Sequence, residues 1–216
     1  MQQIKTPDGS VTFHNTEFNE AYHSKSGAKE EAVKKFVEPC QIKEIAKTGS
    51  IKILDVCFGL GYNTAAAIDA ILEENPECKI EVIGLEIDEK MLQLLVDLPD
   101  SFLSYPLIKE TIKNKYIYNK NNITIQIIIG DATETIKKIE NEFDAIFFDP
   151  FSPKKCPQLW TEEIFKECYR LLKKNRRLAT YSCARVVRDN MKKAGFTIID
   201  GPQLWRRGPS TIGVKL

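Results

Sequence analysis

Acidic residues and glycines stand directly after four apolar stretches of this 216-residue sequence. Carboxylates accept hydrogen bonds from hydroxyl and amino groups, and a glycine backbone lets a ligand approach closely. If the stretches are neighbouring strands, their ends meet at one edge of a sheet and form a site for a polar small molecule. In chain order the residues are Asp55 to Gly61, Glu86, Asp131 with Ala132, and Asp149 with Pro150 and Phe151.

The first of these places is a glycine loop. Gly59 and Gly61 are one residue apart and are followed at once by a helical pattern. A phosphate-binding P-loop ends in Gly-Lys-Ser/Thr, which this loop lacks. A dinucleotide fingerprint has a third glycine, and Thr64 stands in its place. The spacing alone therefore leaves the ligand open.

The carboxylates narrow the choice of ligand. Glu86 can accept two hydrogen bonds from vicinal ribose hydroxyls, a contact that suits both NAD and S-adenosylmethionine. Asp131 can accept from an adenine amino group, or it only caps the helix that follows. NAD enzymes have no general need for carboxylates at all these strand ends, whereas S-adenosylmethionine carries ribose, adenine and a methionine tail. We predict S-adenosylmethionine as cofactor, with its methionine tail on the glycine loop, and assign Phe58, Gly59, Gly61, Asn63, Glu86, Asp131, Ala132 and Asp149 to its binding.

The elements that position these residues alternate along the chain. Several strand-like runs are apolar almost throughout, as strands covered on both faces are. Alternating strands and helices predict an α/β fold with a doubly wound, mostly parallel sheet. The last two runs are joined without a helix, so one of them is expected to run antiparallel. The strand-like runs are 51–57, 79–86, 123–130, 144–149, 177–183, 196–200 and 210–216, and the helix-like runs are 62–73, 88–97, 131–139, 160–172 and 184–194.

Two segments fall outside this alternation. Residues 1–50 are expected to form an N-terminal hairpin, turning at Asp8-Gly9, and a helix that Pro39 ends. Residues 51–216 are expected to form the main domain. Within it, residues 104–122 are interpreted as an insertion, helical at its start and polar at its end.

Charge is distributed unevenly, although the net charge is only +1. Residues 151–216 hold 15 Lys and Arg against 5 Asp and Glu, which leaves 16 basic and 25 acidic side chains in residues 1–150. This asymmetry favours a polyanionic partner reached through the basic part.

Composition also argues against some classes of protein. The six cysteines form no Cys-x-x-Cys pair and there are two histidines, so neither a metal site nor a disulfide framework is expected. No apolar stretch has the length of a membrane span, and the first residues contain no signal core. We therefore expect a cytoplasmic protein that does not bind membranes.

Several motifs resemble one known family. They are an Asp-x-Phe-x-Pro turn at 149–153, Pro-x-x-Trp-Thr at 157–161, Leu-Ala-Thr-Tyr-Ser at 178–182 and Ala-Gly-Phe at 194–196, with "TPDGSVTF", "YHSKSGAKEEA" and "FGLGYN" upstream. Together they are similar to the methyltransferase part of the bacterial bifunctional tRNA 5-methylaminomethyl-2-thiouridine biosynthesis enzymes (MnmC). The resemblance covers most of the chain outside 104–122. It implies a class I S-adenosylmethionine-dependent methyltransferase fold, Rossmann-like, with a seven-stranded, mostly parallel sheet and an antiparallel last strand.

The resemblance also implies a reaction: methyl transfer to the amine of 5-aminomethyl-(2-thio)uridine at the wobble position, in the anticodon loop of tRNA. Asp149 is the candidate to hold the amine and accept its proton, while Pro150 and Phe151 shape the pocket. Tyr22 and Ser24 are candidates to close over the cofactor. Bifunctional members also carry an FAD-dependent oxidase domain, for which this sequence has no room, so we expect a stand-alone methyltransferase.

One departure from the family concerns the turn after the fourth strand. Many members have glycine where this chain has Pro150. Asp-Pro-Phe is similar to the Asp-Pro-Pro-Phe/Tyr turn of DNA and RNA amino-methyltransferases, which also methylate a nucleic-acid amine. Another amino-methyltransferase activity therefore stays open.

Basic residues near the strand ends are the candidates for RNA contacts. Lys154, Lys155, Arg185, Arg188, Arg206 and Arg207 follow strand ends or lie in the last loop, and we expect them to bind phosphates. Lys173, Lys174, Arg176 and Arg177 lie at the opposite end of a helix and a strand and are expected to be solvated. Trp160 is expected to pack at a helix start, and Trp205 is a candidate for base stacking.

Two further functions stay open. An aminopropyltransferase of the spermidine synthase type has a related fold and cofactor, but its family has an acidic residue right after the glycine loop and an acidic substrate pocket. This chain has Tyr62-Asn63 there and a basic C-terminal part. A non-catalytic RNA-binding subunit is the other alternative. Four residues argue against it: Gly59, Gly61, Glu86 and Asp149.

Overall fold

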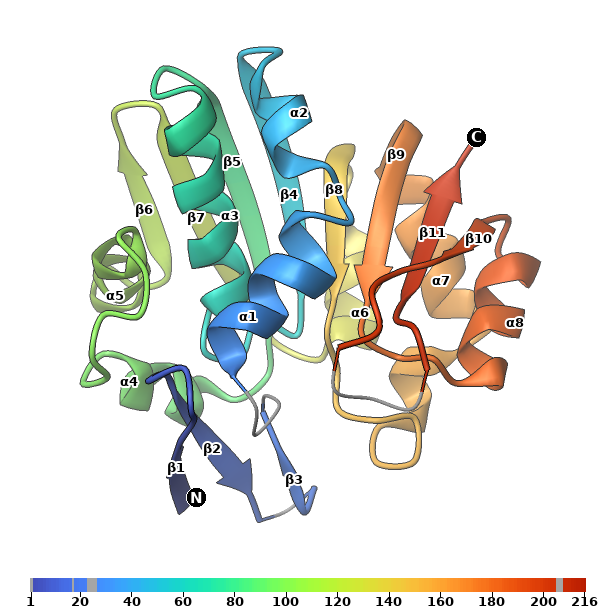
Figure 1. The fold of residues 1–216 in the computed structure, drawn as a ribbon, viewed down its shortest axis with the longest axis horizontal. Coiled ribbons are helices and arrows are strands. Elements are labelled where there is room, and N and C mark those ends of the chain that lie inside the picture. Colours follow the sequence, from blue (N-terminus) through green and yellow to red (C-terminus); the bar gives the residue numbers. More distant parts are fainter. Residues whose placement is uncertain (1, 17, 23–26, 205–207) are drawn as a thin grey trace.

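An eight-stranded sheet forms the centre of the computed structural model, which describes residues 2–16, 18–22, 27–204 and 208–216 (Figure 1). The strand order is β10-β11-β9-β8-β4-β5-β7-β6. Strands β9, β8, β4, β5 and β7 pair in parallel, which confirms the predicted doubly wound α/β fold. The strands are β4 (Ser50–Val56), β5 (Lys79–Glu86), β6 (Ile117–Lys120), β7 (Ile123–Ile129), β8 (Phe143–Phe148), β9 (Leu172–Thr180), β10 (Thr197–Asp200) and β11 (Thr211–Lys215).

Helices pack in two groups against this sheet. In the first group, α3 (Tyr62–Glu74) contacts α1 (Ala28–Ala32), the π-helix η1 (Val33–Val37), α2 (Ile42–Ala46) and α5 (Tyr105–Lys113). The second group contains α6 (Ala132–Thr135), the 3₁₀ turns η2 (Ile136–Lys138) and η3 (Pro157–Trp160), α7 (Glu162–Leu171) and α8 (Arg185–Lys193). A short helix, α4 (Glu89–Leu95), packs on α5.

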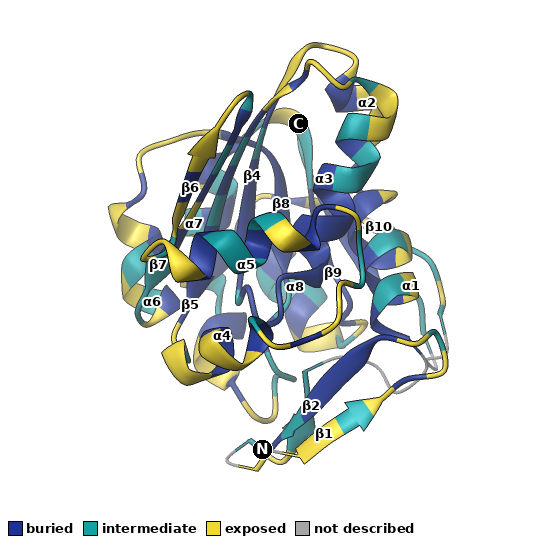
Figure 2. Cartoon of the chain, turned by 90° about the vertical axis from the view of Figure 1, so that its left-hand side faces the viewer, coloured by how far each residue is buried: buried dark blue, intermediate teal, exposed yellow. Residues whose placement is uncertain are grey.

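The middle strands are apolar because both of their faces are covered. All six residues of β8 are buried, and so are the last four of β4 (Figure 2). Their burial leaves only the strand ends open to ligands, which fits the placement of polar residues after each apolar run.

Both edges of the sheet contain antiparallel strands. β11 pairs antiparallel with β9 and with β10, as the missing helix between the last two runs predicted. The other edge differs from the expected seven strands. Residues 117–120 of the supposed insertion form β6, which pairs antiparallel with β7 and turns at Asn121, a residue with a φ of 53°.

The predicted N-terminal hairpin is confirmed, since β1 (Gln2–Lys5) and β2 (Val11–Asn15) pair antiparallel. β2 also pairs with β3 (Glu20–Ala21), and this small sheet lies across the carboxyl end of the large one (Figure 1). Tyr62 of α3 fixes it by donating from its hydroxyl to the Val11 carbonyl oxygen at 2.8 Å. The division of the chain at residue 50 remains a prediction.

Among the described residues, no helix has the length and apolar character needed to cross a membrane. Their His, Cys, Asp and Glu side chains also form no group of three or more that could hold a metal ion.

Candidate functional site

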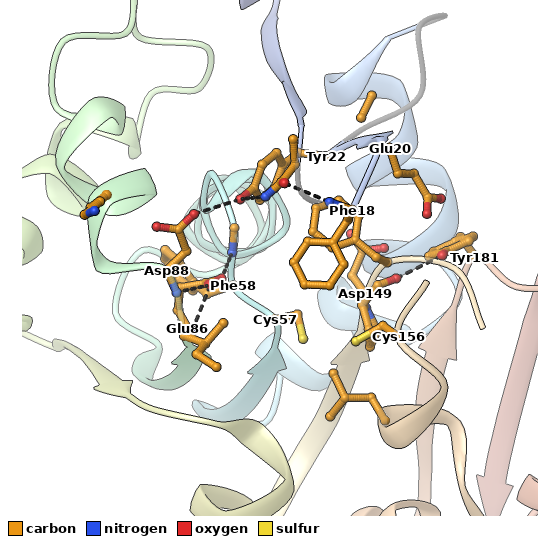
Figure 3. Close-up of a pocket in the computed structure, with 18 of the residues that line it drawn as sticks. Phe18, Glu20, Tyr22, Cys57, Phe58, Glu86, Asp88, Asp149, Cys156 and Tyr181 are labelled. Carbon is orange, nitrogen blue, oxygen red and sulfur yellow. Dashed lines mark hydrogen bonds between the residues drawn. The ribbon is translucent and has the colours of Figure 1, made fainter. Parts of the chain in front are cut away.

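A cavity of about 770 Å³ opens where the small sheet meets the carboxyl ends of β4, β5 and β8 (Figure 3). Seven of the residues predicted for the site line it: Tyr22, Phe58, Gly59, Glu86, Asp149, Pro150 and Phe151. The cavity therefore lies where the polar residues after the strands were expected to meet. Four other predicted cofactor residues, Gly61, Asn63, Asp131 and Ala132, are not part of its lining.

The two glycines of the loop have different roles. Gly59 has a φ of 55° and lines the cavity, and its N–H donates to Oε2 of Glu86 at 2.8 Å. Gly61 has a φ of 71° and begins α3. A Cβ at Gly61 would lie 2.8 Å from the ring of Phe58 and 2.9 Å from Ile108. Gly61 is therefore required by the packing beneath the loop, whereas Gly59 presents its backbone to the cavity.

Glu86 is fixed by the backbone around it. Oε1 accepts from the N–H groups of Ile87 and Asp88, each at 2.8 Å, and Oε2 accepts from Gly59. Burial raises the pKa of Glu86, and these three bonds oppose that rise. Each carboxylate oxygen has two lone pairs, so Oε1 is fully used and Oε2 can accept one further bond, from a ligand.

Two neighbours of Glu86 were missed by the sequence analysis. Ile87 is 63% exposed and lines the cavity, so it offers an apolar surface to a flat ring. Asp88 accepts from the hydroxyl of Tyr22 at 3.3 Å and from the Met91 N–H at 3.0 Å. The available signal was their position immediately after a strand end.

Asp149 occupies the other half of the cavity. Its Oδ2 accepts a hydrogen bond from Nδ2 of Asn63 at 3.0 Å. Burial, and then the negative charge of Glu31, raise the pKa of Asp149 well above its usual range. Asn63 thus lies behind the cavity wall and holds the carboxylate that lines it.

The turn after Asp149 is held by two buried aromatic residues. The hydroxyl of Tyr181 donates to the Pro150 carbonyl oxygen at 2.9 Å, and Nε1 of Trp160 donates to that of Phe151 at 2.8 Å. Trp160 is 2% exposed, which agrees with the packing role expected for it. The turn is therefore fixed on both carbonyl groups.

The half of the cavity that contains Asp149 is acidic. Glu20 lines it and accepts from the N–H and the hydroxyl of Ser152, at 3.1 Å and 2.8 Å. Glu31 also lines it and forms a buried ion pair with Lys35 at 2.6 Å. The sequence analysis assigned neither glutamate to the site, because neither follows an apolar strand-like run. Lys35 offsets the charge of Glu31, and the carboxyl oxygens of this wall are acceptors that suit a ligand with an amino group.

Asp131 lies on the exposed surface and caps α6 by accepting from the Thr133 N–H at 2.9 Å. Ala132, the first residue of α6, is buried. The capping alternative for Asp131 is thus observed, and contacts of Asp131 and Ala132 with an adenine ring remain predictions.

The basic candidates fall into three groups. Lys154 and Lys155 are exposed in the loop that joins Phe151 to Cys156 of the cavity lining, and the side chain of Arg185 is 95% exposed. Arg188 is engaged within the protein, since its guanidinium donates to Asp200 at 2.7 Å and to the Thr211 hydroxyl at 3.0 Å. A phosphate at Arg188 would compete with these bonds. Ser24, Trp205, Arg206 and Arg207 lie outside the described residues.

The expectation of solvated basic residues at 173–177 is wrong for most of them. Nζ of Lys173 donates to both carboxylate oxygens of buried Asp144, at 3.0 Å and 2.9 Å, and Arg176 lies 3.4 Å from the same carboxylate. Arg177 donates to the Pro39 carbonyl oxygen at 3.0 Å. These groups neutralise or satisfy buried partners.

The lining fits an S-adenosylmethionine-like molecule. A glycine backbone at φ 55°, a fixed carboxylate and an exposed apolar side chain lie together at the ends of β4 and β5. The glycine backbone is a surface for a polar tail, the carboxylate is an acceptor for a ribose hydroxyl, and the apolar side chain is a surface for a base.

Comparison with known proteins agrees with this assignment. A family model described as S-adenosyl-L-methionine-dependent methyltransferase matches residues 99–215. The crystal structure of MNMC2 from Aquifex aeolicus superimposes with a TM-score of 0.88 and 33% identity, over 99% of this chain and 70% of that one. A spermidine synthase from Thermotoga maritima shares the fold, with a TM-score of 0.55 and 17% identity over 94% of this chain and 67% of that one.

Curated relatives are longer than this chain. An uncharacterized protein of Methanocaldococcus jannaschii is 31% identical over 98% of this chain, which spans 59% of that protein. The tRNA 5-methylaminomethyl-2-thiouridine biosynthesis bifunctional protein MnmC of Pseudomonas entomophila is 25% identical over 93% of this chain, which spans 33% of it.

Proposed function

From the premise that this chain belongs to the S-adenosyl-L-methionine-dependent methyltransferase family, related to the methyltransferase portion of MnmC, we propose that its acceptor is an amine on tRNA. The proposed acceptor is 5-aminomethyl-(2-thio)uridine at the wobble position, and the product is 5-methylaminomethyl-(2-thio)uridine. The observation that supports this most is the acidic half of the cavity, where Asp149, Glu31 and Glu20 lie beside the glycine loop. An amine is the group that such a wall would attract.

The cofactor is S-adenosyl-L-methionine, which supplies an activated methyl group when bound. We assign its binding to Gly59, to the carboxylate of Glu86 and to the apolar side chain of Ile87. Tyr22 lies over this half of the cavity and bonds to Asp88 (Figure 3). Gly61 and Asn63 support the loop and Asp149 from behind.

Asp149 is proposed to receive the amine. A free alkylammonium is mostly protonated at pH 7 and has to lose a proton before it becomes a nucleophile. A carboxylate whose pKa is raised is a better proton acceptor than an ordinary one, because the gap between the two pKa values is smaller. Asn63 fixes the carboxylate, so that the amine is positioned as well as deprotonated.

The basic residues on the same edge are proposed to contact tRNA phosphates. Lys154, Lys155 and Arg185 lie after β8 and β9, at the end of the sheet where the cavity opens. Bases in a single-stranded loop can be turned out and read in a pocket, whereas paired bases cannot. Because mature tRNA is used in the cytoplasm, we also propose that location.

The test is a transfer assay with purified protein, S-adenosyl-L-methionine and tRNA that carries 5-aminomethyl-(2-thio)uridine. We expect nucleoside mass analysis to show one added methyl group at that uridine. Unmodified tRNA and tRNA with a carboxymethylaminomethyl uridine serve as controls and should not react. Methylation of unmodified tRNA at the same rate would contradict the proposed acceptor.

Aminopropyl transfer is the second candidate, and one observation favours it. The sequence contrasts a basic C-terminal part with the acidic pocket of that family, but Glu20, Glu31 and Asp149 line the cavity of this chain. A diamine would also suit these carboxylates. The same protein should therefore be incubated with putrescine and decarboxylated S-adenosylmethionine, and formation of spermidine in place of methylated tRNA would select this alternative.

A further inference from the structure

Two aromatic rings of the cavity lining stack on each other. Phe18, in the turn between β2 and β3, stacks on Phe151 with ring centroids 4.8 Å apart and ring planes 24° apart. Both side chains line the cavity and both are partly exposed. Tyr22 packs its ring edge against Phe151 with a centroid distance of 5.0 Å.

The two rings are held in different ways. Phe151 belongs to the turn whose carbonyl groups accept bonds from Tyr181 and Trp160, and both of these residues are buried. Phe18 belongs to the small sheet, whose nearby contacts to the large-sheet loops come from side chains. Glu20 accepts from Ser152, and Tyr22 donates to Asp88. Phe151 is therefore a fixed face. Phe18 lies in the turn between β2 and β3, which contacts the large-sheet loops through these side chains, while Tyr62 anchors the small sheet at Val11 of β2.

The stacking distance shows what such a movement would admit. Bases stack at about 3.4 Å, so a base between two rings needs about 7 Å between their planes. The present spacing is too small for a base, and an outward shift of Phe18 by a few ångströms would create the space. Without a base, the stack covers the apolar faces of both rings.

We propose that Phe18 and Phe151 form a stacking slot for the pyrimidine ring of the acceptor nucleotide, with Phe18 as a substrate-binding residue on the small sheet. This inference rests on the proposed function. Asp149 is two residues before Phe151, so a ring in the slot would carry its aminomethyl group toward the acidic wall. Aromatic stacking does not depend on base edges, so the slot binds the ring while the carboxylates recognise the amine.

The test compares Phe18→Leu, Phe18→Ala and Phe18→Tyr with the wild-type protein in the tRNA transfer assay. Leu keeps an apolar side chain without an aromatic face, and Tyr restores that face. We expect Phe18→Leu and Phe18→Ala to lower kcat/KM for tRNA about ten-fold to a hundred-fold, mainly through KM, and Phe18→Tyr to stay within about three-fold. Affinity for S-adenosyl-L-methionine should be unchanged, and the proteins are compared at a temperature where all of them are folded. Leu103→Ala, at a side chain 92% exposed outside the cavity lining, is the control.

The outcomes separate this inference from the function on which it rests. A wild-type protein that does not methylate aminomethyl tRNA would overturn both. An active wild-type protein with a normal KM in Phe18→Leu would overturn the stacking slot alone. Loss of cofactor affinity in Phe18→Ala would also overturn it, because Phe18 would then act on the cofactor.

Discussion

Asn63 donates a hydrogen bond from Nδ2 to Oδ2 of Asp149 at 3.0 Å, across 86 residues of sequence. The bond joins the first turn of the helix after the glycine loop to the end of β8. It couples the element that presents the cofactor surface to the carboxylate on the acceptor side of the cavity. Asp149 therefore has a fixed orientation before any substrate binds.

Replacing Asp149 by Asn should separate catalysis from stability. Burial and the charge of Glu31 raise the pKa of Asp149, so the folded chain binds this proton more tightly than the unfolded chain. The contribution of Asp149 to the free energy of unfolding therefore falls as pH rises. Asn is neutral at every pH, so the variant does not lose this stability. We expect a higher melting temperature than wild type at pH 8, and turnover reduced at least about a hundred-fold.

Cofactor affinity is the control for this variant. Asp149→Asn should bind S-adenosyl-L-methionine within about ten-fold of wild type, because its proposed partner is the substrate amine. A variant that still methylates aminomethyl tRNA at a near-normal rate would remove Asp149 from the reaction.

Asn63→Ala should move the pH dependence of the reaction. The Asn63 bond lowers the pKa of Asp149, so its removal raises that pKa further. Because the ionised carboxylate is the form that accepts a proton, the acidic limb of the profile of kcat/KM should shift to higher pH. Asn114→Ala, in an exposed residue at the end of α5, is the matched control and should leave the profile in place.

The glycines should fail in different assays. Gly59→Val puts a side chain into the cavity and should abolish detectable binding of S-adenosyl-L-methionine in calorimetry, with a stability cost of about 1–2 kcal/mol from its positive φ. Gly61→Val has the same backbone cost, and its Cβ would also clash with Phe58 and Ile108. This overpacking should cost about 1–3 kcal/mol more. We expect the larger drop in melting temperature in Gly61→Val. Equal melting temperatures would contradict the division of roles between the two glycines.

The sheet and half of the cavity follow from local sequence patterns. The apolar runs that became β4, β5 and β8 can be recognised without tertiary information, and parallel strands bring their carboxyl ends together. This convergence is why Gly59, Glu86 and Asp149 were correctly expected near one another.

The other half of the cavity depends on contacts between distant parts of the sequence. Glu20 reaches Ser152 across 132 residues, and nothing in the N-terminal segment's own pattern indicates where its small sheet docks. The contact of Lys173 with Asp144 is also a long-range one, because the pairing of β8 with β9 brings the two residues together. Periodicity shows which face of an element is buried, but not which distant charge meets it.

Charge reversal at Lys154 and Lys155 should weaken tRNA binding more than reversal at Lys192 and Lys193. Both pairs are adjacent and exposed, but the second lies at the far end of α8, which runs back from the carboxyl edge of the sheet. Each lost phosphate contact should reduce the slope of log affinity against log salt by about one. Filter binding over a salt series checks this, and equal slopes for the two double variants would refute this position of the RNA-binding face. Lys173 is unsuitable as a control because it neutralises Asp144.

A buried carboxyl group beneath the glycine loop should make stability depend on pH. The Thr64 hydroxyl donates to Oδ2 of Asp55 at 2.7 Å, while Oδ1 has no hydrogen-bond partner among the described residues. Burial raises the pKa of Asp55 to about 7 from its ordinary value of 3.8.

Between these two values the folded chain retains a proton that the unfolded chain releases, so stability should fall as pH rises from about 4 to about 7. At full effect one proton corresponds to about 1.4 kcal/mol per pH unit. Asp55→Asn cannot titrate, and its free energy of unfolding should fall less steeply than that of wild type between pH 5 and pH 7, about where the linkage is strongest. Urea unfolding at several pH values measures both slopes. The absolute stability of the variant is not the readout, since a buried Asn amide without a partner costs about 1–3 kcal/mol at every pH. Parallel curves for the two proteins would show that Asp55 is already ionised in the folded chain.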